Sequence, residues 1–398
     1  MSAQDANPGK LVDANLVATH AYQVLLAQKA AGKVEENCWS DGGLPARELE
    51  ALVAHQKALL STPLEELKTW ASGADSTFDP AKDLNPLLEC ALRPADPRLP
   101  VNVLAGWLRD SRALASLLQM MLDIERDGDL LQDMYRVYHA LGLPVHFGQI
   151  GITAAGDEEF LEVGKELSPR MCASPFATDP ATLQMLLHKM YNWGRRYTGE
   201  RNKTVLAKEL LAEADSAALV PLIRCMPAEK IAVIGHSFTM DVNWASPSAF
   251  VPIVAEIFKA LNPRVEIRQW AQGGLTASRA CNALRFHDEV LAWKPHRVLL
   301  VVAVRTEEDD EALEKMGRAF ARAGVKAATF DGLTPAPERF AYDTERASGS
   351  GAVSIIEVRR RLAEAPDRDK FLSLDGIHMT EPYHRLMAKE WLKYLLGL

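Results

Sequence analysis

The second half of the chain alternates between short apolar runs typical of strands and longer segments with helical periodicity. The strand-like runs cover residues 231–234, 265–269, 298–304 and 327–330, and the helical patterns between them cover 247–261, 277–293 and 308–323. Repeated strand, helix and strand segments indicate βαβ units, which form a parallel sheet with helices on both faces. We therefore predict an α/β domain over residues 226–398, with a flavodoxin-like three-layer α/β/α architecture.

Functional residue types follow directly after three of these predicted strands. Ser237 follows the first in a Gly-His-Ser sequence, Gly274 follows the second, and Arg305 follows the third. The carboxyl ends of parallel strands open on one edge of the sheet, where ligands bind in open α/β folds. We expect these segments to converge on one site.

A fourth segment, Ser-Leu-Asp-Gly-Ile-His, contains Asp375 and His378 near the end of the chain. An Asp-x-x-His tetrapeptide can place a carboxylate beside an imidazole, and with Ser237 it supplies a nucleophile, a base and an orienting group. Each piece alone is also compatible with a plain turn or loop. Their joint occurrence, in this order and in an α/β context, favours a catalytic triad.

These residues resemble the SGNH or GDSL-type serine esterases and lipases, a family recognised by four sequence blocks. The first block is matched by Gly-His-Ser-Phe-Thr at 235–239, where His236 replaces the family's aspartate. The oxyanion-hole glycine of the second block is matched by Gly274. The fourth block is matched by Asp375-Gly-Ile-His378-Met-Thr, which precedes a predicted helix.

The third block is where the chain departs from the family. The family has Gly-x-Asn-Asp after its third strand, and this chain has no asparagine there. Arg305 or Thr306 is the candidate replacement, and an alternative for Arg305 is a surface ion pair. The resemblance covers residues 226–398 and implies nothing about the first 225 residues.

The resemblance implies an ester hydrolase that needs neither a metal nor a cofactor. Ser237 would attack the ester carbonyl, His378 would take the serine proton, and Asp375 would orient the imidazole. The backbone N–H groups of Ser237 and Gly274 would stabilise the oxyanion. Loss of one such donor costs about 10²–10³ in rate, so a substitute for the missing asparagine matters.

Two other features of this half bear on the site. Successive side chains on a strand or tight turn point in opposite directions, so His236 is expected to face away from the Ser237 hydroxyl. The stretch 332–354 is predicted to be a loop, either over the active site or a plain insertion. Four aromatic residues either line an acyl or sugar pocket or pack in the core: Trp244, Trp270, Phe340 and Tyr342.

The first half of the chain is predicted to be helical, and we assign residues 1–225 to an all-α domain of unknown role. Apolar residues recur at helical intervals over residues 11–31, 46–60, 64–71, 103–126, 130–141, 158–167 and 182–197. A further helix over 203–225 leads to the first strand, and we place the domain boundary in or just before it. The basic and aromatic segment 193–203 is either an anion-binding element or an exposed helix end.

Composition limits the partners and the compartment. The 398 residues carry a net charge of −8 without a basic block, which argues against a nucleic-acid partner. The histidines and cysteines show no metal-ligand spacing. Five widely spaced cysteines do not form a disulfide framework, and no apolar leader or membrane span is evident. These features favour a cytoplasmic protein, with a secreted or periplasmic location as the alternative if a leader has been removed.

The predicted activity is therefore hydrolysis of a carboxylic ester through an acyl-enzyme. The substrate would carry an acetyl or short acyl group, on a carbohydrate, a lipid or another small molecule, and the triad alone does not identify it. Two rival interpretations remain open. The same triad can pass the acyl group to an alcohol, as an acyltransferase, or the domain can be an inactive binding or scaffold module. The oligomeric state is not predicted.

Overall fold

The computed structural model divides the chain into two compact units, Met1–Thr198 and Gly199–Leu398. The residues that it describes are 46–60, 180–240, 245–282, 285–331, 352–366, 370–373 and 378–398, together with single positions between 133 and 165.

Most of the described residues of the first unit are helical. Helices α2 (Ala46–Leu60) and α9 (Pro180–Thr198) coincide with two of the predicted helices. The described residues within 133–140 and 160–165 are also helical. Buried aromatic residues pack between these segments, where Tyr135 stacks on Tyr197 with ring centroids 5.0 Å apart. The helices predicted over 11–31, 64–71 and 103–126 lie outside the described residues, so an all-α first domain stays a prediction.

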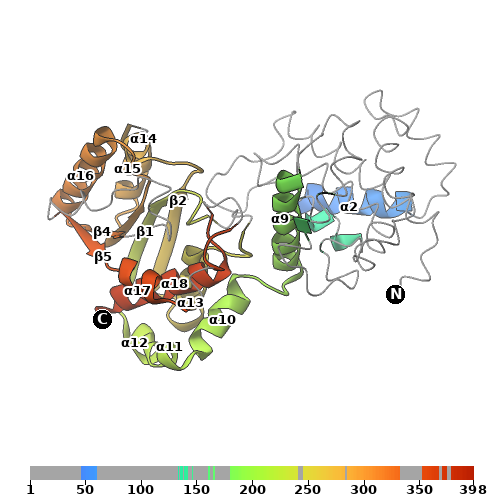
Figure 1. The fold of residues 1–398 in the computed structure, drawn as a ribbon, viewed down its shortest axis with the longest axis horizontal. Helices are drawn as coiled ribbons and strands as arrows, with labels where there is room; N and C mark the ends of the chain where they lie inside the picture. The colour runs from blue at the N-terminus through green and yellow to red at the C-terminus, as the bar shows by residue number, and fades with distance from the viewer. Residues whose placement is uncertain are drawn as a thin grey trace. The chain divides into compact units, whose positions relative to one another are not determined.

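The second unit contains a five-stranded sheet in the order β2-β1-β3-β4-β5, and every pairing is parallel (Figure 1). The strands are β1 (Glu229–Gly235), β2 (Val265–Ala271), β3 (Arg297–Val301), β4 (Lys326–Phe330) and β5 (Val353–Ile356). This strand order is the flavodoxin-like order, in which the chain reverses its direction of travel between β1 and β3. The predicted α/β fold with a parallel sheet is confirmed.

Helices cover both faces of this sheet (Figure 1). One face carries α13 (Phe250–Leu261), α17 (Arg359–Glu364) and α18 (Glu381–Leu396). Helices α10 (Lys203–Ala212) and α12 (Leu219–Cys225) pack on α13 and α18. The other face carries α14 (Ala277–Asn282), α15 (Arg285–Ala292) and α16 (Glu307–Arg322). Both faces are covered because β1 is apolar at every position from Ile231 to Ile234, and all four of these residues are buried.

Two sequence predictions need correction. The segment 203–225 is not one helix, because it breaks at Glu213, where the backbone is extended between α10 and the short α11 (Ala214–Ala217). The predicted loop 332–354 overlaps β5, whose first residues pair with β4 at the sheet edge. Four residues are too few for a sequence pattern to indicate a strand, and the extended conformation of β5 depends on its pairing with β4.

Helices α10 to α12 belong to the second unit, since α10 packs on α13 and α18. The boundary between the compact units thus falls after Thr198 in the sequence, whereas the sequence assignment of domains was 1–225 and 226–398. None of the helices in the described part of the chain is long and apolar enough to cross a membrane.

Candidate active site

Ser237 lies just beyond the carboxyl end of β1, which is flanked by β2 and β3. The chain leaving β1 is held from both sides. The amide of His236 donates to the carbonyl of Val301, 3.1 Å away, and the amide of Gln272 donates to the carbonyl of Gly235, also 3.1 Å away. The position of Ser237 is therefore determined by the neighbouring strands and not by its own turn alone.

The turn itself closes on the carbonyl of His236, which accepts from both the amide and the hydroxyl of Thr239, at 3.0 and 2.9 Å. This arrangement requires glycine at position 235, because a Cβ there would lie 2.3 Å from the Thr239 hydroxyl oxygen. Ser237 is half-buried, while His236 and Thr239 are buried. The Gly-x-Ser-x-Thr pattern thus leaves the serine as the member of the turn that reaches solvent.

His236 supports the turn from the interior. Only 3% of it is exposed, and its Nδ1 accepts from the amide of Phe238 at 3.3 Å. Burial lowers the pKa of His236 to about 3, with smaller effects from His378 and Arg305 nearby. The ring is consequently neutral and carries its proton on Nε2. A neutral imidazole whose Nδ1 is already engaged does not fit the role of a second base.

Gly274 lies in the loop between β2 and α14 with a backbone φ of +64°, which is in the left-handed region that favours glycine. A Cβ at this position would meet no atom within 4 Å, so the glycine borders open space. The loop is attached to the end of β3, where the amide of Ala303 donates to Leu275 at 3.0 Å and the amide of Ala277 donates to Ala303 at 2.9 Å. The ends of β1, β2 and β3 therefore converge at one edge, as the strand pattern predicted.

Arg305 and Thr306 form the connection from β3 to α16, and both are exposed. Thr306 is the N-cap of α16, and its hydroxyl oxygen accepts from the amide of Asp309 at 3.2 Å. The same hydroxyl lies 3.3 Å from a carboxylate oxygen of Asp309, to which it donates. Because both hydrogen-bonding roles of this hydroxyl are used within the cap, Thr306 does not fit the place of the missing asparagine. The guanidinium of Arg305 is the remaining candidate.

His378 is positioned by a short antiparallel ladder just before α18. The amide of Ser373 donates to the carbonyl of His378 at 2.9 Å, and Leu372 forms a β-bridge with Met379. The imidazole ring centroid lies 6.3 Å from that of Phe238, the residue after the candidate nucleophile. The structure thus brings His378 to the same edge as Ser237, whereas Asp375 lies outside the described residues.

The pocket-lining interpretation of Trp270 is wrong. Its side chain is 1% exposed, and its indole N–H donates to Glu289 at 3.2 Å. It also packs edge-on against Trp293, so it belongs to the core between the sheet and α15. The other three aromatic candidates, Trp244, Phe340 and Tyr342, lie outside the described residues.

Asp309 joins two of the loops at this edge and was not predicted from the sequence. A signal for it was present, because Thr306-x-x-Asp309 is the spacing of a helix cap. Within the described part of the chain, no three histidine, cysteine, aspartate or glutamate side chains lie close enough together to hold a metal ion.

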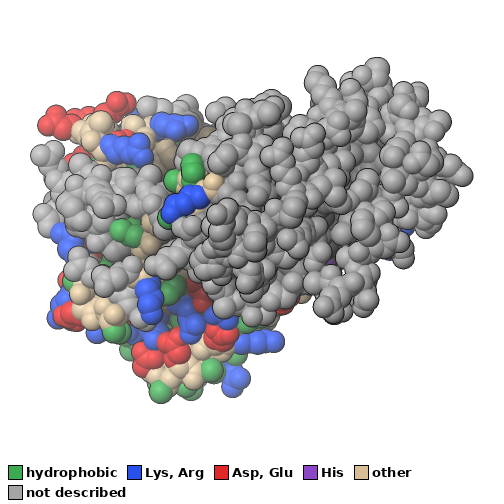
Figure 2. Space-filling view, turned by 45° about the vertical axis from the view of Figure 1, so that its right-hand side comes forward, with side chains coloured by type: hydrophobic (Ala, Val, Ile, Leu, Met, Phe, Trp, Pro, Cys, Tyr) green, Lys and Arg blue, Asp and Glu red, His purple; other side chains and the backbone are tan. Residues whose placement is uncertain are grey.

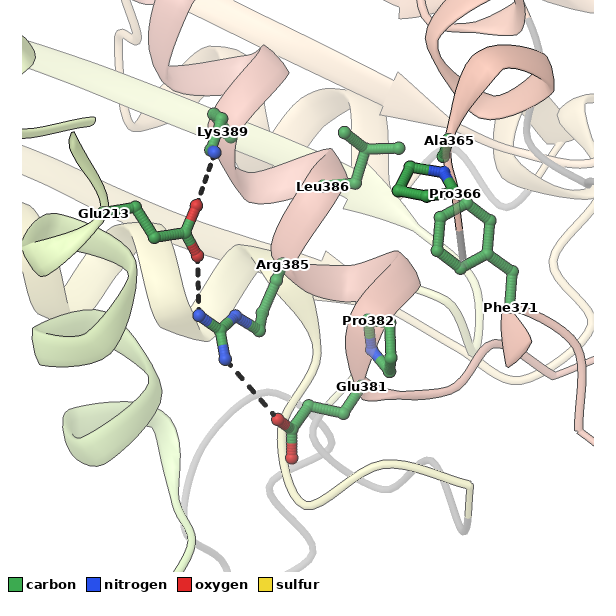
Figure 3. Close-up of a pocket in the computed structure, with 9 residues that line it drawn as sticks. All are labelled: Glu213, Ala365, Pro366, Phe371, Glu381, Pro382, Arg385, Leu386 and Lys389. Atoms are coloured by element: carbon green, nitrogen blue, oxygen red, sulfur yellow. Dashed lines mark hydrogen bonds and ion pairs between the residues drawn. The ribbon is translucent and has the colours of Figure 1, made fainter. Parts of the chain in front are cut away.

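Away from this edge, charged side chains line one side of a cavity of about 490 Å³ beside the start of α18 (Figure 3). Glu213 lies there between two cations, with a carboxylate oxygen 2.6 Å from Arg385 and the other 2.5 Å from Lys389. The opposite wall is apolar, with Leu386 and Phe371 among its members. The residues that line this cavity do not include the candidate nucleophile or base.

Comparisons with known proteins found solved structures of low similarity to this chain. No family model and no curated protein matches the sequence. The chain is similar in structure to a lipase/acylhydrolase from Enterococcus faecalis, with 18% identity, a TM-score of 0.35, and coverage of 42% of this chain and 96% of that one. A catalytic mutant of an acetylxylan esterase from Geobacillus stearothermophilus shows 13% identity and a TM-score of 0.35, over 44% of this chain and 97% of that one. A two-domain esterase active on acetylated mannans shows 17% identity and a TM-score of 0.35, over 46% of this chain and 52% of that one.

Proposed function

We propose that this protein is a serine esterase of the SGNH type that hydrolyses a carboxylic ester through an acyl-enzyme on Ser237. The observation that carries the proposal is the convergence of separate segments on one sheet edge. A half-buried serine at the end of β1, a glycine with positive φ after β2, and a histidine before α18 all lie there. These are the parts that acyl transfer needs, namely a nucleophile, an oxyanion donor and a base.

In the proposed mechanism, His378 takes the proton of the Ser237 hydroxyl as its oxygen attacks the ester carbonyl. The resulting oxyanion accepts from the backbone N–H groups of Ser237 and Gly274. The guanidinium of Arg305 supplies the third donor, in the place where the family has asparagine. The tetrahedral intermediate then collapses, and His378 passes the proton to the departing alcohol.

Deacylation repeats these steps with water as the nucleophile. His378 removes a proton from water, the hydroxide attacks the acyl carbonyl, and Ser237 leaves with its proton restored. We assign Asp375 the role of orienting His378, as the Asp-x-x-His spacing and the family resemblance suggest. The substrate class that we propose is an acetyl or short-acyl ester of a carbohydrate or a lipid. We assign catalysis to residues 226–398, which lie within the second unit, Gly199–Leu398.

A fluorophosphonate probe tests for an activated serine directly. We expect the full-length protein to be labelled, and Ser237→Ala and His378→Ala to lose labelling. Ser354→Ala is the matched control, because this serine is exposed on the edge strand β5 and lies outside the candidate site. Turnover of p-nitrophenyl acetate and butyrate, measured on the same samples, reports the acyl-chain preference.

Absence of both labelling and turnover in folded protein would overturn the esterase proposal and favour an inactive binding module. Labelling that survives in Ser237→Ala would place the nucleophile elsewhere. Labelling without hydrolysis, followed by acyl transfer to an added alcohol, would identify an acyltransferase instead.

A further inference from the structure

Asp309 is a buried carboxylate that the proposed mechanism does not use. It lies in the first turn of α16 and is 2% exposed. One oxygen accepts from the amide of Ser278 at 2.9 Å and from the Ser278 hydroxyl at 2.6 Å. The other accepts from the amide of Arg305 at 2.9 Å and from the Thr306 hydroxyl at 3.3 Å. Backbone and hydroxyl donors, rather than cations, satisfy this buried charge.

These donors belong to the two loops that carry the candidate oxyanion donors. Ser278 lies in the first turn of α14, just after the loop that holds Gly274. Its hydroxyl also lies 3.2 Å from that of Thr276, which forms a β-bridge with Ala303 at the end of β3. Arg305 lies in the connection between β3 and α16. One carboxylate therefore fastens both loops at the edge where Ser237 emerges.

We propose that Asp309 is a positioning residue that sets the placement of the Gly274 amide relative to the Arg305 side chain, and so builds the oxyanion hole. This inference rests on the proposed function. Oxyanion donors act only when they lie about 2.7–3.1 Å from the developing charge. A displacement of about 1 Å can cost about 10² in rate, so the tie between the loops has a catalytic consequence beyond stability.

The hydrogen bonds also assign the donor atom of Arg305. Its backbone N–H donates to Asp309, so the donor that we propose for the oxyanion is the guanidinium. Burial opposes ionisation of Asp309, but the Ser278 hydroxyl and the amides of Ser278 and Arg305 outweigh it and lower its pKa to about 2. The carboxylate is thus ionised throughout the pH range in which an esterase is assayed.

The first test is Asp309→Asn in the full-length protein, with p-nitrophenyl acetate as substrate. Asparagine keeps the size of the side chain but sets an NH₂ group against donors that need an acceptor. We expect kcat to fall about tenfold to a hundredfold while KM changes by less than about threefold. The control Glu308→Gln removes a charge from the same helical turn at an exposed position, and we expect wild-type kinetics.

A double-mutant cycle separates positioning from plain stabilisation. If Asp309 acts through Arg305, Asp309→Asn will cost several-fold less in kcat in an Arg305→Ala background than in the wild type. Equal losses in the two backgrounds would overturn this coupling. Ser278→Ala provides a milder variant, which removes the hydroxyl donor and keeps the amide, in case Asp309→Asn does not fold by circular dichroism.

The two proposals fail in different ways. Wild-type protein without turnover that depends on Ser237 would refute the esterase proposal itself. Turnover that depends on Ser237 but is unchanged in kcat by Asp309→Asn and by Ser278→Ala would refute only the positioning role.

Discussion

The second unit holds buried or half-buried carboxylates in two regions, and their partners differ. At the carboxyl edge of the sheet, Asp309 accepts hydrogen bonds from backbone amides and hydroxyls. Beside α18, Glu213 lies between Arg385 and Lys389, in a network that extends to Glu209 and Asp215. Acidic and basic side chains alternate on the surface of the lower part of this unit (Figure 2).

The two regions differ in the part that an arginine side chain plays in holding the carboxylate. The guanidinium of Arg385 bonds to carboxylates, so its charge is neutralised within the protein. Arg305 gives Asp309 only its backbone amide, so its guanidinium takes no part in holding that carboxylate. We infer that the network beside α18 contributes to stability, while at the sheet edge backbone and hydroxyl donors, not cations, hold Asp309.

The largest effect is expected for His378→Ala, which removes the proposed base at the sheet edge. The catalytic groups of a triad act as a unit, so we expect kcat/KM for p-nitrophenyl acetate to fall by about 10⁴ or more. Lys389→Ala, at the other region, removes a cation of the ion-pair network and is expected to leave kcat/KM within about twofold. Equal losses of kcat/KM in the two variants would contradict the proposed difference between the regions.

Arg305→Ala sharpens the comparison at the level of one guanidinium. We expect kcat to fall about a hundredfold, because the proposed oxyanion donor is lost while the backbone bond to Asp309 remains. Arg305→Asn, which restores the family residue, should recover part of this loss. Arg322→Ala, an exposed position in the last turn of α16, is the control. A wild-type kcat in Arg305→Ala would contradict the proposed oxyanion role and indicate an ordinary surface arginine.

Gly235→Ala tests how tightly the nucleophile turn is packed. The new Cβ would lie 2.3 Å from the Thr239 hydroxyl oxygen, and such overpacking costs about 1–3 kcal/mol. Urea unfolding measures this loss. Gly273→Ala, whose Cβ would meet nothing within 4 Å, should change the free energy of unfolding by less than about 0.5 kcal/mol. Adding Thr239→Ala to Gly235→Ala should cost less than the sum of the two changes.

The smallest effect is expected in the ion-pair network. Burial opposes ionisation of Glu213, but hydrogen bonds from Lys389 and Arg385 outweigh it, so its pKa is lower than usual. The carboxylate therefore stabilises the fold above the unfolded pKa, and this contribution disappears as the pH falls through the lowered folded pKa. Because the group is partly solvated, we expect Glu213→Gln to cost about 0.5–1 kcal/mol at pH 7.

Salt and pH series of urea unfolding measure this term. The difference between wild type and Glu213→Gln should shrink in 1 M NaCl and below about pH 4, since salt screens the pair and acid neutralises it. The exposed pair Arg360–Glu364, 3.9 Å apart, offers Glu364→Gln as a control with almost no effect. A difference that persists at low pH would assign the role of Glu213 to packing.

Local sequence pattern predicted most of the parallel sheet. The runs that became β1 to β4 are rich in branched apolar residues, and their spacing by helical segments implied parallel order. Glu213 was not predicted to interrupt a helix, because its extended backbone accompanies contacts with residues more than 170 positions away. Sequence periodicity depends on residues that are close in the chain, whereas these contacts join residues that are far apart in the chain and close in space.

The candidate site likewise contains residues that local pattern predicted and residues that only tertiary contacts identify. Ser237 and Gly274 were predicted because strand ends of a parallel sheet meet at one edge, whatever the details of their loops. Asp309 was not predicted as part of the site, since its link to Ser278 spans 31 positions and depends on how α14 packs beside α16. The preference for Arg305 over Thr306 as the proposed third donor likewise depends on the hydrogen bonds of the helix cap.

The sequence by itself determined the strand and helix alternation, the parallel sheet and the residues that reach its carboxyl edge, because each follows from short-range periodicity and chain direction. Tertiary structure decided that position 235 requires glycine, that Thr306 is a cap, and that Asp309 joins two loops. Steric exclusion and hydrogen bonding act over a few ångströms in space, and the folded chain alone determines which residues come that close.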